Sequence, residues 1–223
     1  FYDTDGTEIR SFSSVEPEVS EEASKEDPDR DPVVPTKAGM NRFAWDMRYH
    51  GSLPIACTFD RPTGPLAVPG HYEARLTAEG KTHCKPFEIR KDPRINVTQE
   101  DLQAQFKLAV RIRDKVSEAN YGVSQLRSVY QQIDQWVGRV EKKSSEELVA
   151  RMARIFKEKL TAIEHELVEP RAADSLNRLN YPFKLIEKLS ALTSVVTYAD
   201  AMPSRQAYEV CDYLTDQIDG QLV

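Results

Sequence analysis

Trp45, Asp46 and Tyr49 are the side chains whose types and spacing best suit ligand chemistry. An aromatic ring offers a broad apolar face with a polar edge, so Trp45 or Tyr49 would form a platform on which a sugar stacks, beside the Asp46 carboxylate. The competing interpretation is structural, because aromatic side chains commonly fill the cores of β-sandwiches. In this interpretation Trp45 lies in a core, and Asp46 forms a hydrogen bond with the backbone of a loop.

The other titratable groups form no catalytic or metal-binding pattern. Glu164 and Glu166 are two positions apart on a predicted helix and point in different directions, which excludes a glycosidase-type acid–base pair. His83 and Cys84 are adjacent on a predicted strand, so their side chains lie on opposite faces. The sequence therefore assigns no catalytic, cofactor-binding or metal-ligating residue, and no cofactor.

Two short motifs favour structural roles. Asp27, Asp29 and Asp31 alternate as in a calcium-binding loop, but the loop glycine and the closing glutamate are missing. The residues Asn96-Val97-Thr98 match a glycosylation sequon. Thr98 is also well placed to cap a helix, and we interpret it that way.

The charge of the chain is concentrated in one segment. Residues 13–32 carry eight acidic and two basic side chains, which accounts for the whole net charge of −6. The remainder is formally neutral and offers no basic footprint for nucleic acid and no cationic helix face for a membrane surface. No apolar run approaches the ~20 residues that cross a bilayer. None of the three cysteines has CxxC spacing. A Cys57–Cys84 disulfide remains an alternative in an oxidising compartment.

The first part of the chain has the patterns of β-structure. Asp5-Gly6 predicts the tight turn of a hairpin within residues 1–12. Residues 40–49 are typical of an aromatic-rich strand, and residues 71–90 alternate polar and apolar side chains around a turn, which predicts a second hairpin. Residues 14–36 are acidic and poor in large apolar side chains, so we expect them to form a disordered insertion.

From Thr98 onward the apolar residues recur every three or four positions, as on one side of a helix. A heptad series over about 39 residues predicts one long helix, with the members Leu102, Ala109, Val116, Val123, Tyr130 and Val137. A second helix is predicted over residues 145–168 behind a capping box at Ser144. A third should begin near Pro182, a natural first helical position, and a fourth should follow Pro203.

The length of the first helix predicts a partner. At 1.5 Å per residue it is ~60 Å long, whereas the second spans only ~36 Å and folds back over its later half. Because the heptad series persists to both ends, we expect exposed apolar side chains that drive a homodimer through the long helix, with Val123 and Leu126 at the interface. Gly122 marks a potential break, but the register of Val116 and Val123 continues through it.

Two stretches together resemble a known family. The first is Ala38-Gly39-Met40-Asn41-Arg42-Phe43-Ala44-Trp45-Asp46-Met47-Arg48-Tyr49 with Ala67-Val68-Pro69-Gly70-His71-Tyr72, and the second is Leu179-Asn180-Tyr181-Pro182 with Gln206-Ala207-Tyr208-Glu209-Val210. They are similar to the C-terminal region of large bacterial proteins that begin with a sortilin-like β-propeller of neuraminidase-type (BNR) repeats and are often described as glycosyl hydrolases. The β part also resembles the immunoglobulin-like module of flagellar hook-capping proteins.

The resemblance implies that this chain is one part of a larger exported protein, periplasmic or extracellular, whose parts have different roles. Any active site would lie in the upstream propeller, and no catalytic residue carries over; Trp45, Asp46, Gly70 and Tyr72 match a module pattern whose role is structural. The chain is then a non-catalytic C-terminal accessory or assembly module with the propeller as partner. The alternative is a carbohydrate-binding accessory module, or part of a glycoside hydrolase whose active site lies upstream.

These observations predict an α+β protein in two domains. Residues 1–95 would form a small, truncated immunoglobulin-like β-sandwich, since the predicted strands are too few for seven. Residues 96–223 would form an antiparallel four-helix bundle with a long first helix. The opening residues Phe1-Tyr2-Asp3 read like the middle of a strand, so we expect further residues upstream.

Overall fold

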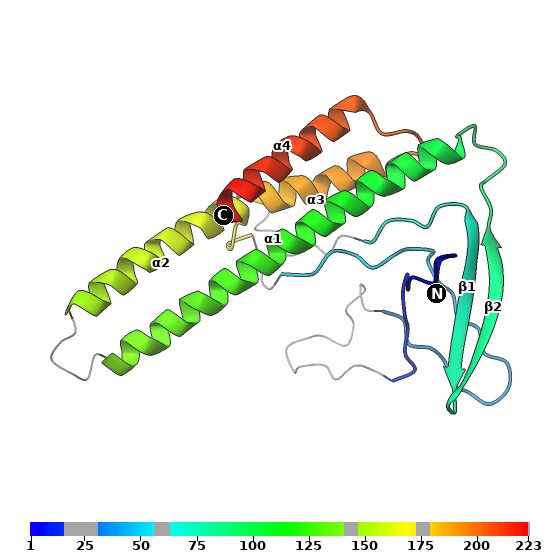
Figure 1. The fold of residues 1–223 in the computed structure, drawn as a ribbon, viewed down its shortest axis with the longest axis horizontal. Coiled ribbons are helices and arrows are strands. Elements are labelled where there is room, and N and C mark those ends of the chain that lie inside the picture. The colour runs from blue at the N-terminus through cyan, green and yellow to red at the C-terminus, as the bar shows by residue number, and fades with distance from the viewer. Residues whose placement is uncertain (16–30, 56–62, 141–146, 173–178, 223) are drawn as a thin grey trace. The chain divides into compact units, whose positions relative to one another are not determined.

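The computed structural model describes residues 1–15, 31–55, 63–140, 147–172 and 179–222. Six elements follow one another along the chain (Figure 1): β1 (Gly70–Ala78), β2 (Lys81–Ile89), α1 (Gln99–Val140), α2 (Glu147–Leu167), α3 (Leu185–Val196) and α4 (Arg205–Leu222). They divide between two compact units. The first unit holds the strands and ends at Gln99, and the second holds the helices from Glu100 onward.

The two strands form an antiparallel hairpin that is closed by Glu79 and Gly80. Both residues have positive φ angles, 50° and 74°, which a two-residue type I′ turn requires at its two central positions. The ladder runs without a bulge from the Ala78–Lys81 pair next to the turn to the Gly70–Ile89 pair at the open end. The predicted second hairpin is therefore confirmed.

The strand predicted over residues 40–49 is wrong. The chain makes one isolated bridge there, between Arg48 and Leu66. Asp46 accepts a hydrogen bond from the Arg48 amide and Met47 has a φ of 60°, so the backbone turns where a strand would continue. With β1 and β2 as the only named strands of the described residues, a complete immunoglobulin-like sandwich is not shown.

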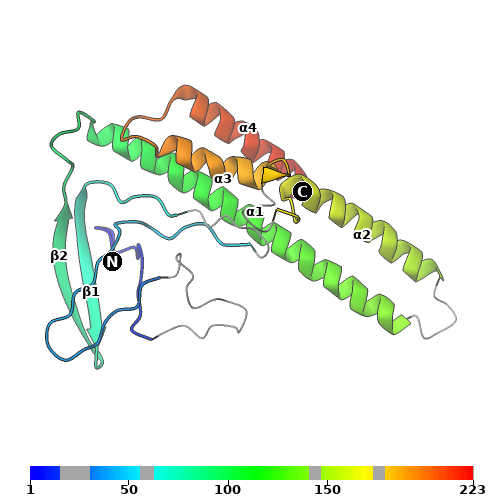
Figure 2. The same cartoon turned by 180° about the vertical axis from the view of Figure 1, so that it is seen from behind.

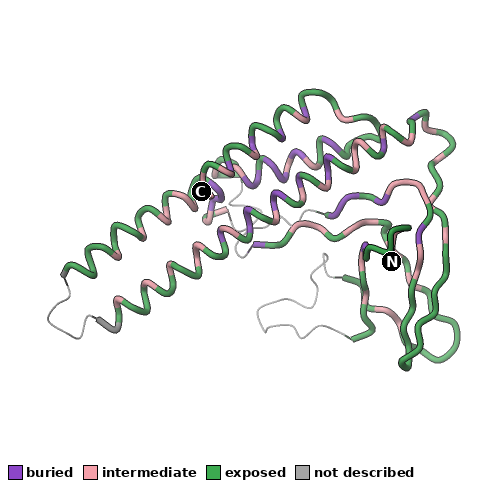
Figure 3. The backbone as a smooth tube through the Cα atoms, in the orientation of Figure 1, coloured by how far each residue is buried: buried purple, intermediate pink, exposed green. Residues whose placement is uncertain are grey.

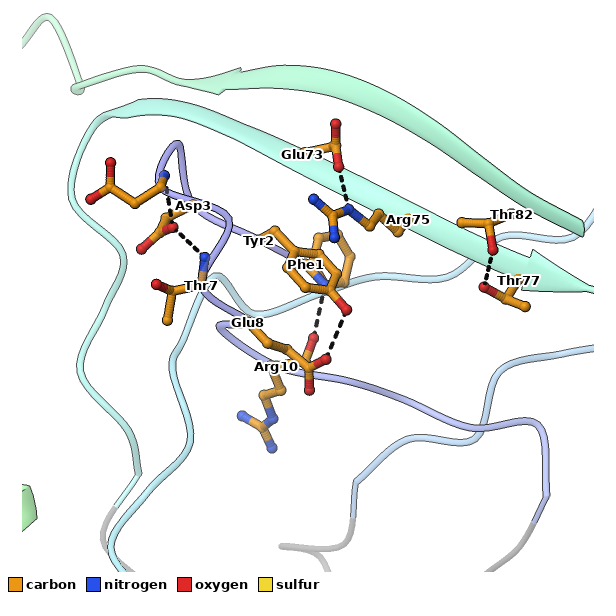
Figure 4. A network of polar contacts seen from close by, with 11 residues as sticks. Phe1, Tyr2, Asp3, Thr7, Glu8, Arg10, Glu73, Arg75, Thr77 and Thr82 are labelled. Carbon is orange, nitrogen blue, oxygen red and sulfur yellow. Dashed lines mark hydrogen bonds and ion pairs between the residues drawn. The ribbon is translucent and has the colours of Figure 1, made fainter.

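The predicted N-terminal hairpin is present as a tight loop with a single bridge in place of paired strands. The Asp3 carboxylate accepts hydrogen bonds from the Asp5 and Thr7 amides, at 3.0 and 2.9 Å (Figure 4). Tyr2 exchanges two backbone hydrogen bonds with Glu73 of β1, both of 2.9 Å. The N-terminal segment is thereby fastened to the outer edge of β1 at one residue pair.

The centre of the predicted disordered insertion at residues 14–36 lies outside the described residues, as do Cys57 and the proposed helix cap Ser144. At the base of the insertion, the Val34 amide donates a hydrogen bond of 2.9 Å to the Ser13 carbonyl. The two described ends of the insertion therefore lie next to each other.

The first helix is continuous, as its heptad series predicts. It has 42 residues, which makes it about 63 Å long. Gly122 causes no break; a Cβ atom at this position would lie 2.6 Å from Cδ2 of Leu222, so the glycine leaves room for the end of α4.

The third helix begins later than the sequence predicts, at Leu185 and not near Pro182. Its N-cap residue is Lys184, whose amide donates a 2.9 Å hydrogen bond to the Glu187 carboxylate. This bond satisfies the backbone donor of the N-cap residue at the start of the helix.

The other helices line α1 in two stages. α3 and α4 lie along its first half, and α2 folds back along its second half, as both views show (Figures 1 and 2). Buried side chains concentrate along the first half (Figure 3). The core there is formed by Ile55, Leu108, Ile112, Val116, Ala119, Val123, Leu167, Val168, Ile186, Leu189, Leu192, Val196, Ala207, Cys211, Leu214 and Ile218.

A short strap, Gly51–Ile55, belongs to the helical unit although it precedes the strands in sequence. The Leu53 amide donates to Oγ of Ser117 at 3.0 Å, and Nδ2 of Asn120 donates to the Leu53 carbonyl at 2.6 Å. Ile55 then enters the helical core. Two polar side chains of α1 thus fix the strap through its backbone.

We expect Asn120→Ala to lower the free energy of unfolding of the helical unit by about 1–3 kcal/mol. Asn120 is 4% exposed, and its loss removes the donor that satisfies the Leu53 carbonyl. Urea unfolding followed by the helical circular dichroism signal measures the loss. Gln125→Ala truncates an exposed amide on the same helix and should cost less than about 0.5 kcal/mol; equal losses would contradict the role of the strap.

Candidate interaction surface

Trp45 and Tyr49, the predicted stacking residues, lie in the aromatic core of the first unit. The Trp45 ring stacks on Phe1 with centroids 4.3 Å apart and meets Phe87 edge-on at 6.3 Å. Its Nε1 donates a hydrogen bond of 3.0 Å to the Arg48 carbonyl. Tyr49 is half-buried and packs against the same cluster. One face of the Trp45 ring is therefore covered by protein.

Asp46 has the role that the structural interpretation gave it. Its Oδ1 accepts a 3.1 Å hydrogen bond from the Arg48 amide, and Oδ2 lies 3.7 Å from the Arg10 guanidinium. Trp45 is partly buried against this core, and Asp46 accepts a hydrogen bond from a loop backbone amide, as the structural interpretation expects. Sugar stacking on Trp45 or Tyr49 stays a prediction.

The other candidate groups remain apart. Glu164 pairs with Arg127 at 2.7 Å, and Asp31 pairs with Arg10. Among the described residues, no three His, Cys, Asp or Glu side chains gather as a metal would require. Within the same ranges, no helix has both the length and the apolar character that crossing a membrane demands.

A strongly perturbed carboxylate, Glu169, lies just after the end of α2. Two hydrogen bonds from Arg171, of 2.7 and 2.9 Å, lower its pKa to about 2. The Glu169 amide donates a hydrogen bond of 3.3 Å to Glu187 of α3. The bond to Glu187 joins the end of α2 to the start of α3, which is a structural role.

The second half of α1 and most of α2 form a two-helix extension, which we call the hairpin arm (residues 126–138 and 148–164). Two ion pairs set its register, Arg127 with Glu164 and Asp134 with Lys157. Asp134 lies seven residues after Arg127 on α1, and its partner Lys157 lies seven residues before Glu164 on α2. The two helices are therefore antiparallel. The same register places Trp136 of α1 at the height of residue 155 of α2.

One side of the hairpin arm carries a groove of about 450 Å³. Its lining includes the Asp134–Lys157 pair, with the Lys157 ammonium 4.2 Å from the centre of the Tyr130 ring. Arg154 and Glu158 also line it and lie 3.9 Å apart. The charged side chains that line the groove are therefore paired with one another.

The opposite side of the hairpin arm exposes several apolar side chains, and Lys159 of α2 shares it, at spacings of three residues from Phe156 and seven from Met152. α1 and α2 touch along one line. On each helix, the exposed apolar residues lie on one side of that line and the groove residues lie on the other side, as follows from the 100° step between successive residues. We call this surface the apolar face, and its members are Val129, Trp136, Val149, Met152 and Phe156, with Leu148 and Ile155 at its outer rim. Trp136 is 68% exposed. Exposed apolar side chains gathered on one surface mark an interaction site.

The α1 side of the hairpin arm has few charges. Between residues 125 and 138 the only ionisable side chains besides Tyr130 are Arg127 and Asp134, and α2 pairs with both of them. The remaining polar positions in this stretch are glutamine or serine. Depletion of charge together with an exposed tryptophan is typical of the centre of a protein–protein interface.

One residue of the dimer interface expected from the sequence is not exposed. Val123, which the sequence placed at a dimer interface, is fully buried in the core of its own chain. The contribution of α2 was missed. The sequence of α2 has apolar residues at Val149, Met152 and Phe156 and also at Leu148 and Ile155, more than one buried stripe accommodates, and this excess was the signal that a second surface is exposed.

Comparison with known proteins supplies no further assignment. The function therefore has to be inferred from the geometry of the hairpin arm and the aromatic core. No family model, no curated protein and no solved structure matches this chain.

Proposed function

We propose that this chain is a non-catalytic assembly module whose helical unit binds another protein surface through the apolar face of the hairpin arm. The observation that carries the proposal is that face itself. It combines five exposed apolar side chains, on two helices held in register by ion pairs, with an α1 stretch whose charges are all paired. A rigid apolar surface is stabilised when a partner removes it from water, at roughly 25 cal/mol per Å².

The aromatic core supports the same interpretation of the first unit. Trp45 stacks on Phe1 and Asp46 binds a backbone amide, so both residues hold the unit together. The proposal places the chain as the C-terminal accessory module of a larger exported propeller protein, with an immunoglobulin-like first domain and the propeller as a partner. The sequence resemblance, and nothing in the fold, supports these last points.

Incubation of the intact chain with chromogenic glycosides and a glycan array tests the proposal against its alternative. We expect no turnover and no glycan binding. Turnover would overturn the proposal. Glycan binding that is lost in Tyr49→Ala would favour the carbohydrate-binding module, because Tyr49 is only half-buried and could still meet a ligand.

A further inference from the structure

The outer half of the β1–β2 hairpin, the part next to the turn, has no covering layer among the described residues. At the other end of the hairpin, Tyr72 is buried and Phe87 packs against the aromatic core. From Arg75 to Pro86, by contrast, every residue is exposed, on both faces of the hairpin. An antiparallel sheet usually has one face packed against a core. The outer half is therefore a surface that is free to meet a partner.

One face of this outer half is basic. Three side chains of β2 share it because they occupy every second position of the strand, and they are Lys81, His83 and Lys85. The residues of β1 directly across from them are two alanines and a leucine. Within the described residues, the ion pairs of the hairpin join Arg75 to Glu73 and Glu88 to Arg90, so neither lysine has an acidic partner.

The opposite face of the outer half is satisfied internally. The Arg75 guanidinium pairs with Glu73 and lies 3.8 Å from the centre of the Tyr2 ring. The hydroxyl groups of Thr77 and Thr82 are hydrogen-bonded to each other at 2.9 Å (Figure 4). The remaining acid of the outer half, Glu79, lies in the turn. Unpaired positive charge is thus confined to the face that carries the two lysines.

The outer edge of β2 exposes backbone groups over a short stretch. Glu73 of β1 exchanges its backbone bonds with Tyr2, so its amide and carbonyl point away from β2. Because Glu73 is paired with Pro86, the alternation of an antiparallel ladder turns the backbone groups of Pro86, Cys84 and Thr82 outward. Pro86 has no N–H and ends this row of donors at no cost to the hairpin. No other described backbone group bonds to the outward groups of Thr82 and Cys84.

We propose that an extended acidic segment of another protein adds to β2 as a third strand along Lys81–Lys85. Its backbone bonds to the outward amides and carbonyls of Thr82 and Cys84, as in other cases of strand addition. Acidic side chains at alternate positions of the segment lie across from Lys81 and Lys85, which are about 14 Å apart along the strand. The surface belongs to the first unit, and the proposal does not depend on the apolar face of the helical unit.

The charge and the backbone together select this partner. A second copy of β2 would place lysine across from lysine, and like charges directly opposite each other destabilise a sheet. The phosphates of a nucleic acid would satisfy the lysines, but their oxygens only accept hydrogen bonds and leave the outward carbonyls of Thr82 and Cys84 without donors. An acidic peptide strand supplies both the carboxylates and the amide donors.

Fluorescence anisotropy with a labelled peptide of alternating glutamate and threonine, about eight residues long, tests the proposal on the intact chain. In low salt we expect a Kd on the order of 100 μM, and about ten-fold weaker binding when glutamine replaces the glutamates. Residues 13–32 of the chain are themselves acidic, so the measurement is repeated on a variant that lacks residues 16–30. If neither form binds the peptide, the lysines and Pro86 only protect the edge from pairing, and the proposal is overturned.

Charge reversal locates the binding surface. The double variant Lys81→Glu and Lys85→Glu should bind the peptide about ten-fold more weakly or less, because attraction across the strands becomes repulsion. The matched control is Lys107→Glu with Lys188→Glu, which reverses two exposed lysines of the helical unit and changes the net charge equally. The control should bind as the unmodified chain does. Equal weakening in both double variants would show that net charge attracts the peptide, which rejects the site on β2.

The backbone contribution has its own test. Cys84→Pro removes the outward amide in the same way as Pro86 does and leaves the β1–β2 ladder bonds in place. It should weaken peptide binding by about ten-fold, whereas Cys84→Ala should not. Amide hydrogen exchange along β1 verifies that the hairpin is intact. If Cys84→Pro disrupts it, a peptide methylated at alternate amides makes the same comparison from the partner's side.

The outcomes distinguish a strand from a simple polyanion. Peptide binding that survives the loss of these backbone amides would reject the third strand, as would a single-stranded oligodeoxynucleotide that binds as tightly as the peptide. Peptide binding that requires both the lysines and the Cys84 amide supports it. Neither result bears on the apolar face, so the proposed function stands or fails by its own experiment.

Discussion

Leu189→Ala should destabilise the helical unit by about 2–5 kcal/mol, the range for truncating a large aliphatic side chain in a closed core. Leu189 lies near the middle of α3 and is 0% exposed. It packs among the residues of α1 and α4 that form the core. Because domains commonly have only about 5–15 kcal/mol of stability, this one change removes a large fraction of it. Urea unfolding monitored at the helical circular dichroism band gives the value.

Val195→Ala is the control for this prediction. Val195 lies on the same helix but is 68% exposed, so its truncation should change the free energy of unfolding by less than about 0.5 kcal/mol. Comparable losses in the two variants would show that the packing of α3 against the core does not limit the stability of the unit.

Trp45→Ala should loosen the first unit by about 2–4 kcal/mol. The change removes the ring stacked on Phe1, the edge contact with Phe87 and the donor to the Arg48 carbonyl. Among the described residues, only Ile9, Ala67 and Tyr72 of this cluster are buried, so each aromatic contact contributes a large share of its stability. Amide hydrogen exchange along β1 and β2 measures the effect in that unit alone.

Trp136→Ala is the matched control, since it removes the same side chain from an exposed position on α1. Exchange along β1 and β2 should be unchanged in this variant. If Trp45→Ala leaves the exchange of β1 and β2 unchanged, Trp45 is not a core residue of this unit, and the sugar-stacking interpretation gains ground.

Patterns between near neighbours predicted most of the secondary structure. The alternation over residues 71–90 and the heptad series from Gln99 depend on the chain within a few turns, and both gave the correct elements. Residues 40–49 failed because strand formation also needs a partner strand. Their aromatic side chains are strand-like, but the backbone finds only one bridge, at Arg48.

The aromatic core required contacts that no local pattern reveals. Trp45 is 44 positions from Phe1 and 42 from Phe87, yet it touches both. Aromatic content alone could not distinguish a stacking platform from a core position. Only the packing shows that Phe1 covers one face of the Trp45 ring.

By itself the sequence determined the two-part α+β organisation, the unbroken first helix through Gly122 and the apolar stripes of the helices. The tertiary structure decided which half of the long stripe is left exposed. On the first half, Ile112, Val116 and Val123 are buried in the core with α3 and α4, whereas Val129 and Trp136 farther along are exposed. A heptad pattern states which side of a helix is apolar, whereas the packing of the other helices determines where along that side the apolar side chains are removed from water.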